Sequence, residues 1–442
     1  MRMRVVLGFL LIFCIQNVSL HAKNKGLSNC GNSCYFNSSM QAMSHLTDFN
    51  ILTKTIPNKN DEIELYNGMM ARLPGEGYIS SGFVVINGKT LEDCYHHFAQ
   101  KFFGLPEFIY PTQEELKKDY DDLVKSVGQA EMPSFKEYFK DNNKPITYYQ
   151  QEDAAEFITK MINFILEYGN VDALKNMVQA EVDSVLNKPA HKKCPLLART
   201  SNSYSDSFKI PISAKPGDVT ILNCLNSYFK PENVDVRCLN CDKDITASKY
   251  FKISRPPKYL ILSLNRFISA DGETYKDETP VLFTDLLVLN SFFSDELLQK
   301  IKNSELTYRL KAFIVHRGKY GHGHYWAYGF DGKNWNIYED ENIYVVSQAD
   351  IEMVFMTGIG PNFGGGTGEP TPYIFFYELD KKSEEILKMA EPQPKHDPAI
   401  KPAQDLLAQK VQNLKSDIKN VEKSIENVQA RLAQVKIKLA KN

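Results

Sequence analysis

Hydrophobic and polar residues follow two different periods along this chain of 442 residues. Apolar residues spaced by three and four predict amphipathic helices over 34–46, 112–126 and 151–167. Runs rich in aromatic and branched residues predict strands over 258–267, 308–316 and 325–330. The two kinds of pattern are mixed without an internal repeat, which favours an α+β domain over a repeat protein.

The pattern changes towards the end of this domain. Glycines and prolines crowd the stretch from Pro361 to Pro372, which predicts a loop leading into a final strand over Tyr373–Tyr377. Residues 379–402 then lose their apolar content and gather four prolines at 392, 394, 398 and 402. This composition predicts a Pro-rich linker.

A heptad pattern begins after the linker and predicts a coiled coil over 403–442, through which chains could oligomerise. A single amphipathic helix packed on the preceding domain is the alternative, but the narrow and regular seam favours the coiled coil. Branched residues occupy both seam positions, so the pattern does not set the number of strands. The seam residues are Leu407, Val411, Leu414, Ile418, Val421, Ile425, Val428, Leu432, Val435 and Leu439.

The N-terminus has the layout of a secretory signal peptide over residues 1–22. A basic start at Met1–Arg4 is followed by an apolar run over Val5–Ile15 and by Ser19-Leu20-His21-Ala22, where cleavage would follow Ala22. Leu20 fits the cleavage pattern imperfectly. A membrane anchor is the alternative, but this run is short for the ~30 Å of a hydrocarbon core. No stable membrane span is predicted elsewhere.

Composition narrows the classes of function. The formal net charge is -2, so nothing in the balance of charges favours nucleic acid as a partner. The hydrophobic fraction of 43% is that of a soluble globular protein. Eight cysteines in 442 residues are too few for a disulfide scaffold.

Candidate chemistry begins at Cys34. Small and polar residues precede this cysteine, and an amphipathic helix containing Met40 and Met43 follows it. The unpaired N–H groups at a helix start carry partial positive charge, which stabilises a thiolate. The side-chain amide of Asn29, five residues earlier, could stabilise a developing oxyanion. A buried and inert cysteine is the alternative.

The spelling of this segment favours the catalytic reading. Residues Gly26–Gln41 resemble the cysteine box of the ubiquitin-specific protease family of deubiquitinases, Gly-Leu-x-Asn-Leu-Gly-Asn-Thr-Cys-Tyr-Met-Asn-Ser-x-x-Gln. Cys30, Ser33 and Phe36 are mild departures from that pattern. The resemblance implies that Cys34 is the nucleophile and that Asn29 stabilises the oxyanion.

A cysteine nucleophile needs a base. Three of the nine histidines cluster at His316, His322 and His324. The segment Gly323–Tyr328 resembles the family's Gly-His-Tyr-x-x-Tyr box, which implies that His324 is the base. We expect His316 to be a hydrogen-bonded structural histidine in a strand, and His322 to lie in an exposed turn.

The third catalytic position departs from the family. Members usually read Trp-Tyr-x-Phe-Asp/Asn-Asp, whereas this chain reads Trp335-Asn336-Ile337-Tyr338-Glu339-Asp340. The resemblance therefore implies that Glu339, which is one methylene longer than aspartate, orients His324. Asp340 could replace it or assist the oxyanion. A weak or inactive enzyme is the other interpretation of the departure.

Two further stretches resemble the same family. Gln151–Phe157 matches the Gln-x-Asp-Ala-x-Glu-Phe box, which implies that Gln151, Asp153 and Glu156 bind the basic C-terminal tail of ubiquitin. Solvated acids on an amphipathic helix are the alternative. Lys258–Phe267 resembles the family's Leu-Ile-x-x-Leu-x-Arg-Phe strand, and the resemblance covers residues 25–378.

Many members of this family carry zinc between two Cys-x-x-Cys knuckles. Cys238 and Cys241 form one such knuckle here, and His191 with Cys194 is at best the other. Three thiolates and one imidazole make an acceptable tetrahedral site. A fold that keeps no metal, or a redox or disulfide role for Cys238 and Cys241, are the alternatives. We expect Cys94 and Cys224 to be core residues.

The resemblance implies a papain-like cysteine protease fold with a thumb, a palm and β-rich fingers, followed by the coiled-coil helix. It implies cleavage of the peptide or isopeptide bond after the C-terminal glycine of ubiquitin, with no cofactor required for catalysis. One alternative is a catalytically impaired module that binds ubiquitin. Another is an interaction protein that acts mainly through its coiled coil.

A signal peptide on a deubiquitinase is unusual, because ubiquitinated proteins are mostly cytosolic or nuclear. One hypothesis accounts for both features: an intracellular bacterium or parasite exports the enzyme, which then acts in the host cytosol. Cleavage at Ala22 would leave seven cysteines, an odd number that argues against a fully disulfide-paired mature protein.

Overall fold

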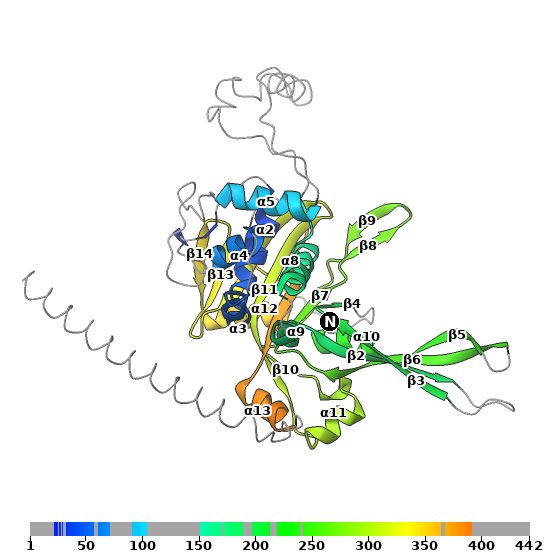
Figure 1. The fold of residues 1–442 in the computed structure, drawn as a ribbon. Coiled ribbons are helices and arrows are strands. Elements are labelled where there is room, and N and C mark those ends of the chain that lie inside the picture. Colours follow the sequence, from blue (N-terminus) through cyan, green and yellow to red (C-terminus); the bar gives the residue numbers. More distant parts are fainter. Residues whose placement is uncertain are drawn as a thin grey trace, which may run out of the picture. The chain divides into compact units, whose positions relative to one another are not determined.

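A computed structural model of the chain describes a large part of it (Figure 1). The described residues are 22–24, 26, 27, 29, 32–56, 61–70, 91–103, 151–169, 172–188, 197–212, 219–238, 242–363 and 367–390. Three predicted segments lie outside them: the signal peptide up to His21, the helix over 112–126 and the coiled coil over 403–442. Contacts divide the chain into two units, Met1–Lys388 and Met389–Asn442.

In the described part of the first unit, a nine-stranded sheet forms the centre. Its order is β1–β14–β13–β12–β11–β15–β7–β4, and β10 pairs with β11. Neighbouring strands are antiparallel except β4 and β7, which are parallel. The strands are β1 (Ala22–Asn24), β4 (Phe208–Ile210), β7 (Tyr259–Leu264), β10 (Leu286–Val288), β11 (Thr307–Lys319), β12 (His322–Phe330), β13 (Trp335–Glu339), β14 (Asn342–Val346) and β15 (Thr371–Leu379).

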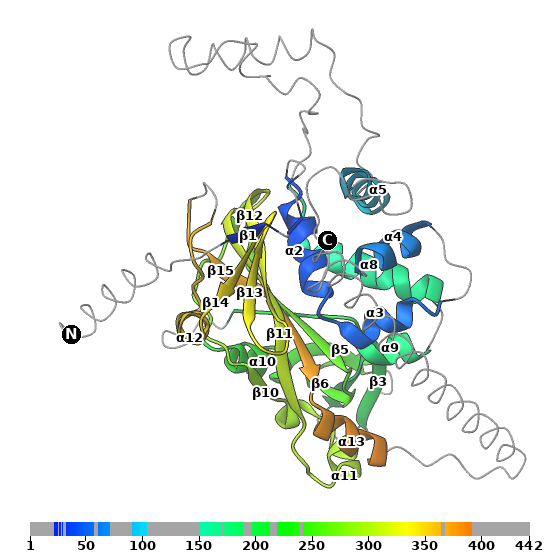
Figure 2. The same cartoon turned by 90° about the vertical axis from the view of Figure 1, so that its left-hand side faces the viewer.

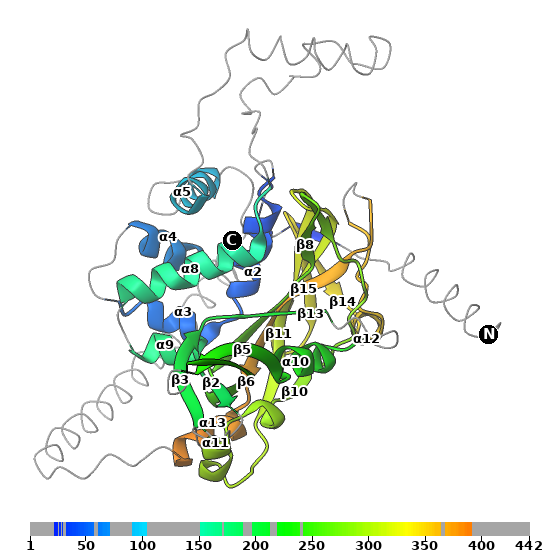
Figure 3. The ribbon, with the colours of Figure 1, turned by 90° about the vertical axis from the view of Figure 1, so that its right-hand side faces the viewer.

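Helices from the first half of the chain cover one face of this sheet (Figures 2 and 3). Every residue of α2 is buried, because α2 packs against β11, β12 and β13 on one side and against α8 on the other. These helices are α2 (Cys34–Met43), α3 (Thr47–Thr53), α4 (Asp61–Met70), α5 (Leu91–Phe103), α8 (Ala154–Gly169) and α9 (Asp172–Val178). They correspond to the predicted thumb, and the sheet to the palm.

The central strands are hydrophobic because both of their faces are covered. All six residues of β7 are buried, and eight of the nine in β15. The face away from α2 is covered in part by α12 (Gln348–Thr357), whose Phe355 packs against Phe313 and Trp335. The palm is therefore a buried layer whose strands cannot shift without disturbing both faces.

A second, four-stranded sheet corresponds to the predicted fingers. Its order is β3–β2–β6–β5, and all its pairs are antiparallel. Its strands are β2 (Ala180–Lys188), β3 (Leu197–Ser205), β5 (Glu232–Cys238) and β6 (Lys243–Arg255). A separate hairpin joins β8 (Phe267–Ala270) to β9 (Glu273–Lys276). Within the described residues 219–300, the helical elements are α10 (Ile221–Phe229), η2 (Asn290–Phe292) and α11 (Asp295–Lys300).

The first part of the predicted linker is not a linker. β15 continues to Leu379, and a helix, α13 (Lys381–Ala390), follows it. The carboxylate of Asp380 accepts a hydrogen bond from the N–H of Ser383 at 2.8 Å, which caps the helix, and the Ser383 hydroxyl accepts one from the N–H of Thr307 at 2.8 Å. The prolines begin only at Pro392, so nothing between 381 and 390 interrupts a helix.

The other predicted elements are present with small shifts at their ends. The helices over 34–46 and 151–167 are α2 and α8, and the strands over 258–267, 308–316 and 325–330 are β7, β11 and β12. The final strand begins at Thr371, two residues before the predicted start. Among the described helices, none is both long enough and apolar enough to cross a membrane.

Candidate active site

Cys34 is the first residue of α2, as its sequence context predicts, and it is buried at 2% exposure. The residues before it are held by Asn29, whose side-chain oxygen accepts hydrogen bonds from the N–H and the hydroxyl of Ser33, both at 3.3 Å. Asn32 has a positive φ of 50°, which turns the chain into the helix. Cys34 is therefore placed by a short turn and by the helix N-terminus.

His324 lies in β12, where its ring interacts with the thiol of Cys34. Its Nε2 lies 3.0 Å from Oε1 of Glu339. Burial alone would lower the pKa of His324. The hydrogen bonds to Cys34 and Glu339, with the charges of Cys34 and Asp340, outweigh burial and raise that pKa to about 10. The site therefore favours an imidazolium at position 324.

Glu339 is fixed by a residue that the sequence did not point to. Its second oxygen, Oε2, accepts a hydrogen bond from the side-chain amide of Asn342 at 3.2 Å. Glu339 and Asn342 pair across a turn of two residues between β13 and β14. Because a two-residue turn sets its flanking residues opposite each other, a polar residue at 342 was the available signal.

Asp340 occupies that turn with a positive φ of 45°. Its two carboxylate oxygens accept hydrogen bonds from the side-chain amides of Asn29 at 2.9 Å and Asn37 at 2.8 Å. Burial raises the pKa of Asp340, and these two bonds oppose the rise. Nε2–H of His324 thus donates its hydrogen bond to Glu339, whereas Asp340 holds the candidate oxyanion amide of Asn29.

The side-chain amide of Gln151 lies beside Cys34. Its amide nitrogen donates hydrogen bonds to Sγ of Cys34 and to the carbonyl oxygen of Gly323, both at 2.7 Å. Gly323 leaves no space for a side chain, because a Cβ there would lie 2.3 Å from the carbonyl oxygen of Arg317. The amide of Gln151 therefore reaches the reacting sulfur directly.

The two acids of the same segment have different surroundings. Asp153 accepts a hydrogen bond from the N–H of Glu156 at 2.9 Å, which caps α8, and another from the hydroxyl of Tyr373 at 2.7 Å. Burial raises the pKa of Asp153. Glu156 is exposed and pairs with Lys160 at 2.8 Å. Asp153 thus has a structural role whatever it binds.

Of the other two histidines of the cluster, His316 lies in a strand as predicted, whereas His322 is exposed as predicted but begins a strand instead of lying in the turn. His322 is exposed and begins β12 directly after the turn. His316 is buried at 1% exposure in β11, and its ring packs against Phe267 and Tyr325. Within the described residues no hydrogen-bond partner reaches Nδ1 of His316, so packing holds this ring more than the expected hydrogen bonding does.

Of the four predicted zinc ligands only Cys238 belongs to the described residues. It ends β5 and is buried at 3% exposure, although most of β5 is not. Its carbonyl oxygen accepts a hydrogen bond from the N–H of Asp242 at 2.8 Å, which closes the turn. Cys241, Cys194 and His191 lie outside the described residues. Cys94 and Cys224 are fully buried, as predicted.

A family model described as "Ubiquitin carboxyl-terminal hydrolase" matches residues 25–377. One similar protein is a probable ubiquitin carboxyl-terminal hydrolase 9 of Schizosaccharomyces pombe, which is 24% identical. The alignment covers 82% of this chain and 67% of that protein. Ubiquitin carboxyl-terminal hydrolase 4 of Candida glabrata is 23% identical and covers 80% of this chain. The chain spans only 40% of that protein's length.

Solved structures agree on the fold. The SAGA Ubp8/Sgf11/Sus1/Sgf73 DUB module bound to ubiquitin aldehyde matches 85% of this chain and 75% of its own, with a TM-score of 0.53 and 16% identity. The same module bound to monoubiquitin gives a TM-score of 0.53 and covers 74% of its own chain. The papain-like fold with thumb, palm and fingers is therefore confirmed. With a family match over 25–377, this chain belongs to the ubiquitin carboxyl-terminal hydrolase family.

Proposed function

We propose that this chain is a thiol-dependent deubiquitinase, which cleaves the peptide or isopeptide bond after the C-terminal glycine of ubiquitin. The observation that carries the proposal is the pairing of His324 with Glu339 at 3.0 Å, together with the interaction of the same ring with Cys34. This arrangement is that of a cysteine nucleophile, its base and an orienting acid. No cofactor takes part in the chemistry of such a triad.

In the proposed reaction the Cys34 thiolate attacks the carbonyl carbon of the terminal glycine. The His324 imidazolium then gives its proton to the departing amine, usually that of a lysine side chain, and the C–N bond breaks. The thioester that remains is hydrolysed by water, from which His324 takes a proton, and Cys34 leaves as the thiolate. Glu339 keeps the ring oriented through both halves.

Two side-chain amides are available for the oxyanion of each tetrahedral intermediate. The amide nitrogen of Asn29 is held by Asp340, and that of Gln151 contacts Sγ of Cys34. Donors fixed in place before the reaction stabilise developing charge without a cost of reorganisation. For Gln151, we thus add a role at the oxyanion to the tail binding that its sequence motif implies.

For Asp153 and Glu156 we propose that they attract the basic C-terminal tail of ubiquitin. Support for this role is their position at the start of α8, two and five residues beyond Gln151, whose amide contacts Cys34. Asp153 is also tied to Tyr373, which would fix the direction of its carboxylate.

A second candidate function is ubiquitin binding without cleavage. The feature that favours it is Glu339, which replaces the shorter acid of the family. Its hydrogen bonds to His324 and Asn342 weigh against this alternative, because an acid that reaches the histidine can orient it.

The decisive experiment treats the purified chain with ubiquitin that carries an electrophile at its C-terminus. We expect a covalent adduct with the wild-type protein and none with Cys34→Ala. Cys224→Ala, which removes another buried cysteine, is the matched control and should still form the adduct. A wild-type protein that binds ubiquitin but forms no adduct would favour the second candidate.

We also propose a structural zinc ion in the fingers, bound by Cys238, Cys241, Cys194 and His191. The burial of Cys238 at the end of a largely uncovered hairpin supports it, since a metal site would shield that thiolate. Metal analysis of the purified protein should find about one zinc per chain. Cys238→Ser should lose the ion, and a metal-free wild-type protein would contradict the proposal.

The coiled coil over 403–442 and export through residues 1–22 remain proposals. Deleting 403–442 should lower the mass of the assembly in solution and leave cleavage of ubiquitin intact. Sequencing the N-terminus of protein from the source cell should find Lys23 first. An intact Met1 would contradict export through a cleaved signal peptide, and with it action in a host cytosol.

A further inference from the structure

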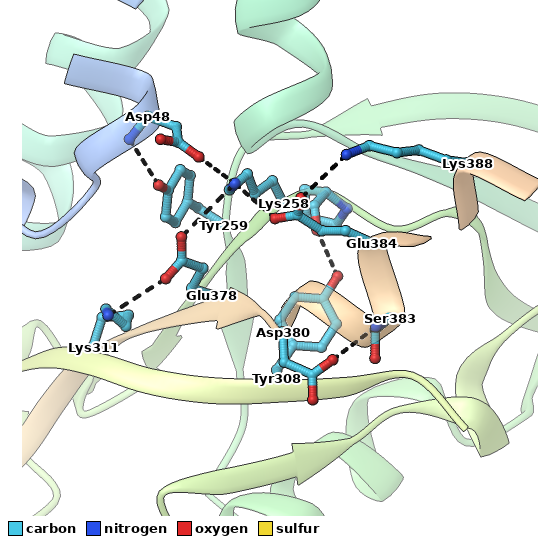
Figure 4. A network of polar contacts seen from close by, with 11 residues as sticks. Asp48, Lys258, Tyr259, Tyr308, Lys311, Glu378, Asp380, Ser383, Glu384 and Lys388 are labelled. Carbon is cyan, nitrogen blue, oxygen red and sulfur yellow. Dashed lines mark hydrogen bonds and ion pairs between the residues drawn. The ribbon is translucent and has the colours of Figure 1, made fainter. Parts of the chain in front are cut away.

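Acidic side chains from three elements converge on Lys258, the residue before β7 (Figure 4). Its ammonium pairs with Asp48 of α3, with Glu384 of α13 at 2.6 Å and with Glu378 of β15 at 3.9 Å. Two further cations balance the acids: Lys311 lies 3.5 Å from Glu378, and Lys388 lies 3.6 Å from Glu384. One ammonium thus joins the thumb, the palm and the C-terminal helix.

The pair between Lys258 and Glu384 is partly buried, with side chains 19% and 20% exposed, whereas the side chain of Asp48 is 48% exposed. Burial lowers the pKa of Lys258, but its hydrogen bonds and charge interactions with Asp48 and Glu384 outweigh burial and raise it. Ion pairs shielded from water are less screened and more rigid than those on an open surface. α13 supplies this shielding from one side.

Backbone groups hold the same elements together. The N–H of Asp48 donates a hydrogen bond to the hydroxyl of Tyr259 at 3.0 Å. The carbonyl oxygen of Lys258 accepts one from the N–H of Leu379 at 2.8 Å, just before α13 begins. The start of α3 and the start of α13 are therefore attached to the same two palm residues, Lys258 and Tyr259.

This attachment bears on the nucleophile, because α3 follows α2 after only three residues. Cys34 lies at the far end of α2, ten residues or ~15 Å from the turn into α3. A tilt of ~4° about that turn would move Cys34 by ~1 Å relative to His324. A displacement of ~1 Å at a reacting atom can cost ~100-fold in rate.

We propose that Lys258 is a positioning residue for the nucleophile helix, and that α13 acts in the same junction through Glu384. α13 begins at Lys381, beyond the residues 25–377 that match the family model, so a segment outside the family domain tunes the catalytic geometry. The test of this inference by cleavage of a ubiquitin substrate rests on the proposed function. The test by alkylation of Cys34 does not.

The test compares variants in the full chain. Lys258→Met and Asp48→Asn break the central pair, Lys258→Arg keeps the charge, and Glu384→Gln removes the link from α13. Glu385→Gln, an exposed acid on the same helix, is the matched control. Each variant is assayed for kcat and KM on a ubiquitin fused to a fluorophore, for iodoacetamide alkylation of Cys34 against pH, and for thermal unfolding.

We expect Lys258→Met and Asp48→Asn to lower kcat by about tenfold with KM changed less than about twofold. Alkylation of Cys34 should shift to higher pH, because a displaced thiolate loses its pairing with His324. Lys258→Arg should recover most of the loss. Glu384→Gln should show a smaller change in the same direction, about threefold, and Glu385→Gln none.

A lower melting temperature in both Lys258→Met and Asp48→Asn, with kcat and the alkylation profile unchanged, would overturn the positioning role. Equal behaviour of Glu384→Gln and Glu385→Gln would overturn the part assigned to α13. If Lys258→Met does not fold, Asp48→Asn decides, because it keeps the backbone bond to Tyr259. A wild-type protein inert to ubiquitin would refute the proposed function and leave the alkylation test valid.

Discussion

One carboxylate oxygen of Glu339 accepts a hydrogen bond from His324, and the other accepts one from the side-chain amide of Asn342. Glu339→Gln keeps the shape of the side chain but removes the charge that stabilises the imidazolium. We expect kcat to fall at least about tenfold with little change in KM, since the ring acts in the proposed reaction and not in binding. Steady-state kinetics on a ubiquitin–fluorophore substrate measure this.

Glu339→Asp provides the comparison, because it restores the family's usual acid at the cost of one methylene. The shorter side chain should reach His324 poorly from this backbone position, so we expect an intermediate kcat. A Glu339→Asp protein faster than wild type would mean that glutamate is a handicap here and not an adaptation of the turn.

Asn37 is a buried side chain that links α2 to the acid turn, which is the turn between β13 and β14 that contains Asp340. Its amide donates to Asp340 at 2.8 Å and to the carbonyl oxygen of Leu27 at 3.2 Å. Because Asp340 in turn holds Asn29, we expect Asn37→Ala to loosen the oxyanion donor and to lower kcat by about tenfold. Alkylation of Cys34 by iodoacetamide forms no oxyanion and should proceed at the wild-type rate.

Ser38→Ala is a suitable control for Asn37→Ala. It removes a buried hydrogen bond from the next residue of α2, at 3.1 Å to the carbonyl oxygen of Tyr35, without touching the acid turn. Its kcat should stay near the wild-type value. Parallel losses of hydrolysis and alkylation in Asn37→Ala would show instead that Asn37 acts on the thiol and its histidine.

The local sequence motifs were sufficient to predict Cys34 at a helix start and the contact between His324 and Glu339. It was not sufficient for Asn37 and Asn342, since their roles depend on which turn lies opposite them in the folded chain. Gln151 shows the same limit: its position in the motif suggested the tail of the substrate, whereas its amide contacts the nucleophile itself.

Gly26 connects β1 to the nucleophile segment and lies against the turn between β13 and β14. Its N–H donates to the carbonyl oxygen of Glu341 at 3.0 Å, and a Cβ at this position would lie 1.9 Å from the carbonyl oxygen of Asp340. Because the obstacle is backbone, Gly26→Ala must displace either the turn or the strand. We expect stability to fall by about 1–3 kcal/mol and kcat by about tenfold or more.

Gly360→Ala tests whether any added methyl group near the sheet has this effect. A Cβ at Gly360 meets its nearest atom, in Val315, at 3.5 Å, which is ordinary contact. Denaturant unfolding and kcat should both stay near wild type for this variant. Wild-type kinetics in Gly26→Ala would mean that the position of the acid turn does not depend on the N-terminal strand.

Periodicity predicted the buried strands and the two long thumb helices because each of them has a face that must be apolar. The same reasoning missed α13, whose composition is polar enough to look like a linker. Only Ser383 of its ten residues is buried, and charge pairs with Lys258 and a capping carboxylate attach the helix to the palm. Elements held by polar contacts leave little hydrophobic pattern to detect.

The thumb and the palm meet across His45, which ties the stability of the whole domain to pH. The ring is 7% exposed between α2 and the sheet, and Nε2 would lie 2.0 Å from a Cβ at Gly329. Burial, with help from the charge of Lys311, lowers the pKa of His45 to about 4. A backbone hydrogen bond to Phe330 and the charge of Asp331 only partly oppose this shift.

A depressed histidine pKa gives a defined pH window for unfolding. Above the unfolded value of 6.5 the ring is neutral in both states, and the contribution of His45 to stability is constant. As the pH falls from about 6.5 to about 4, His45 binds a proton in the unfolded chain but not in the folded chain, and the free energy of unfolding falls by about 3 kcal/mol.

His45→Gln has no proton to gain, so its unfolding free energy should fall less over this window. Urea unfolding at pH 7 and pH 4 measures the difference, and His322→Gln, which changes an exposed histidine, should follow the wild-type slope. Equal slopes for His45→Gln and wild type would mean that the thumb opens enough to hydrate His45 before the domain unfolds.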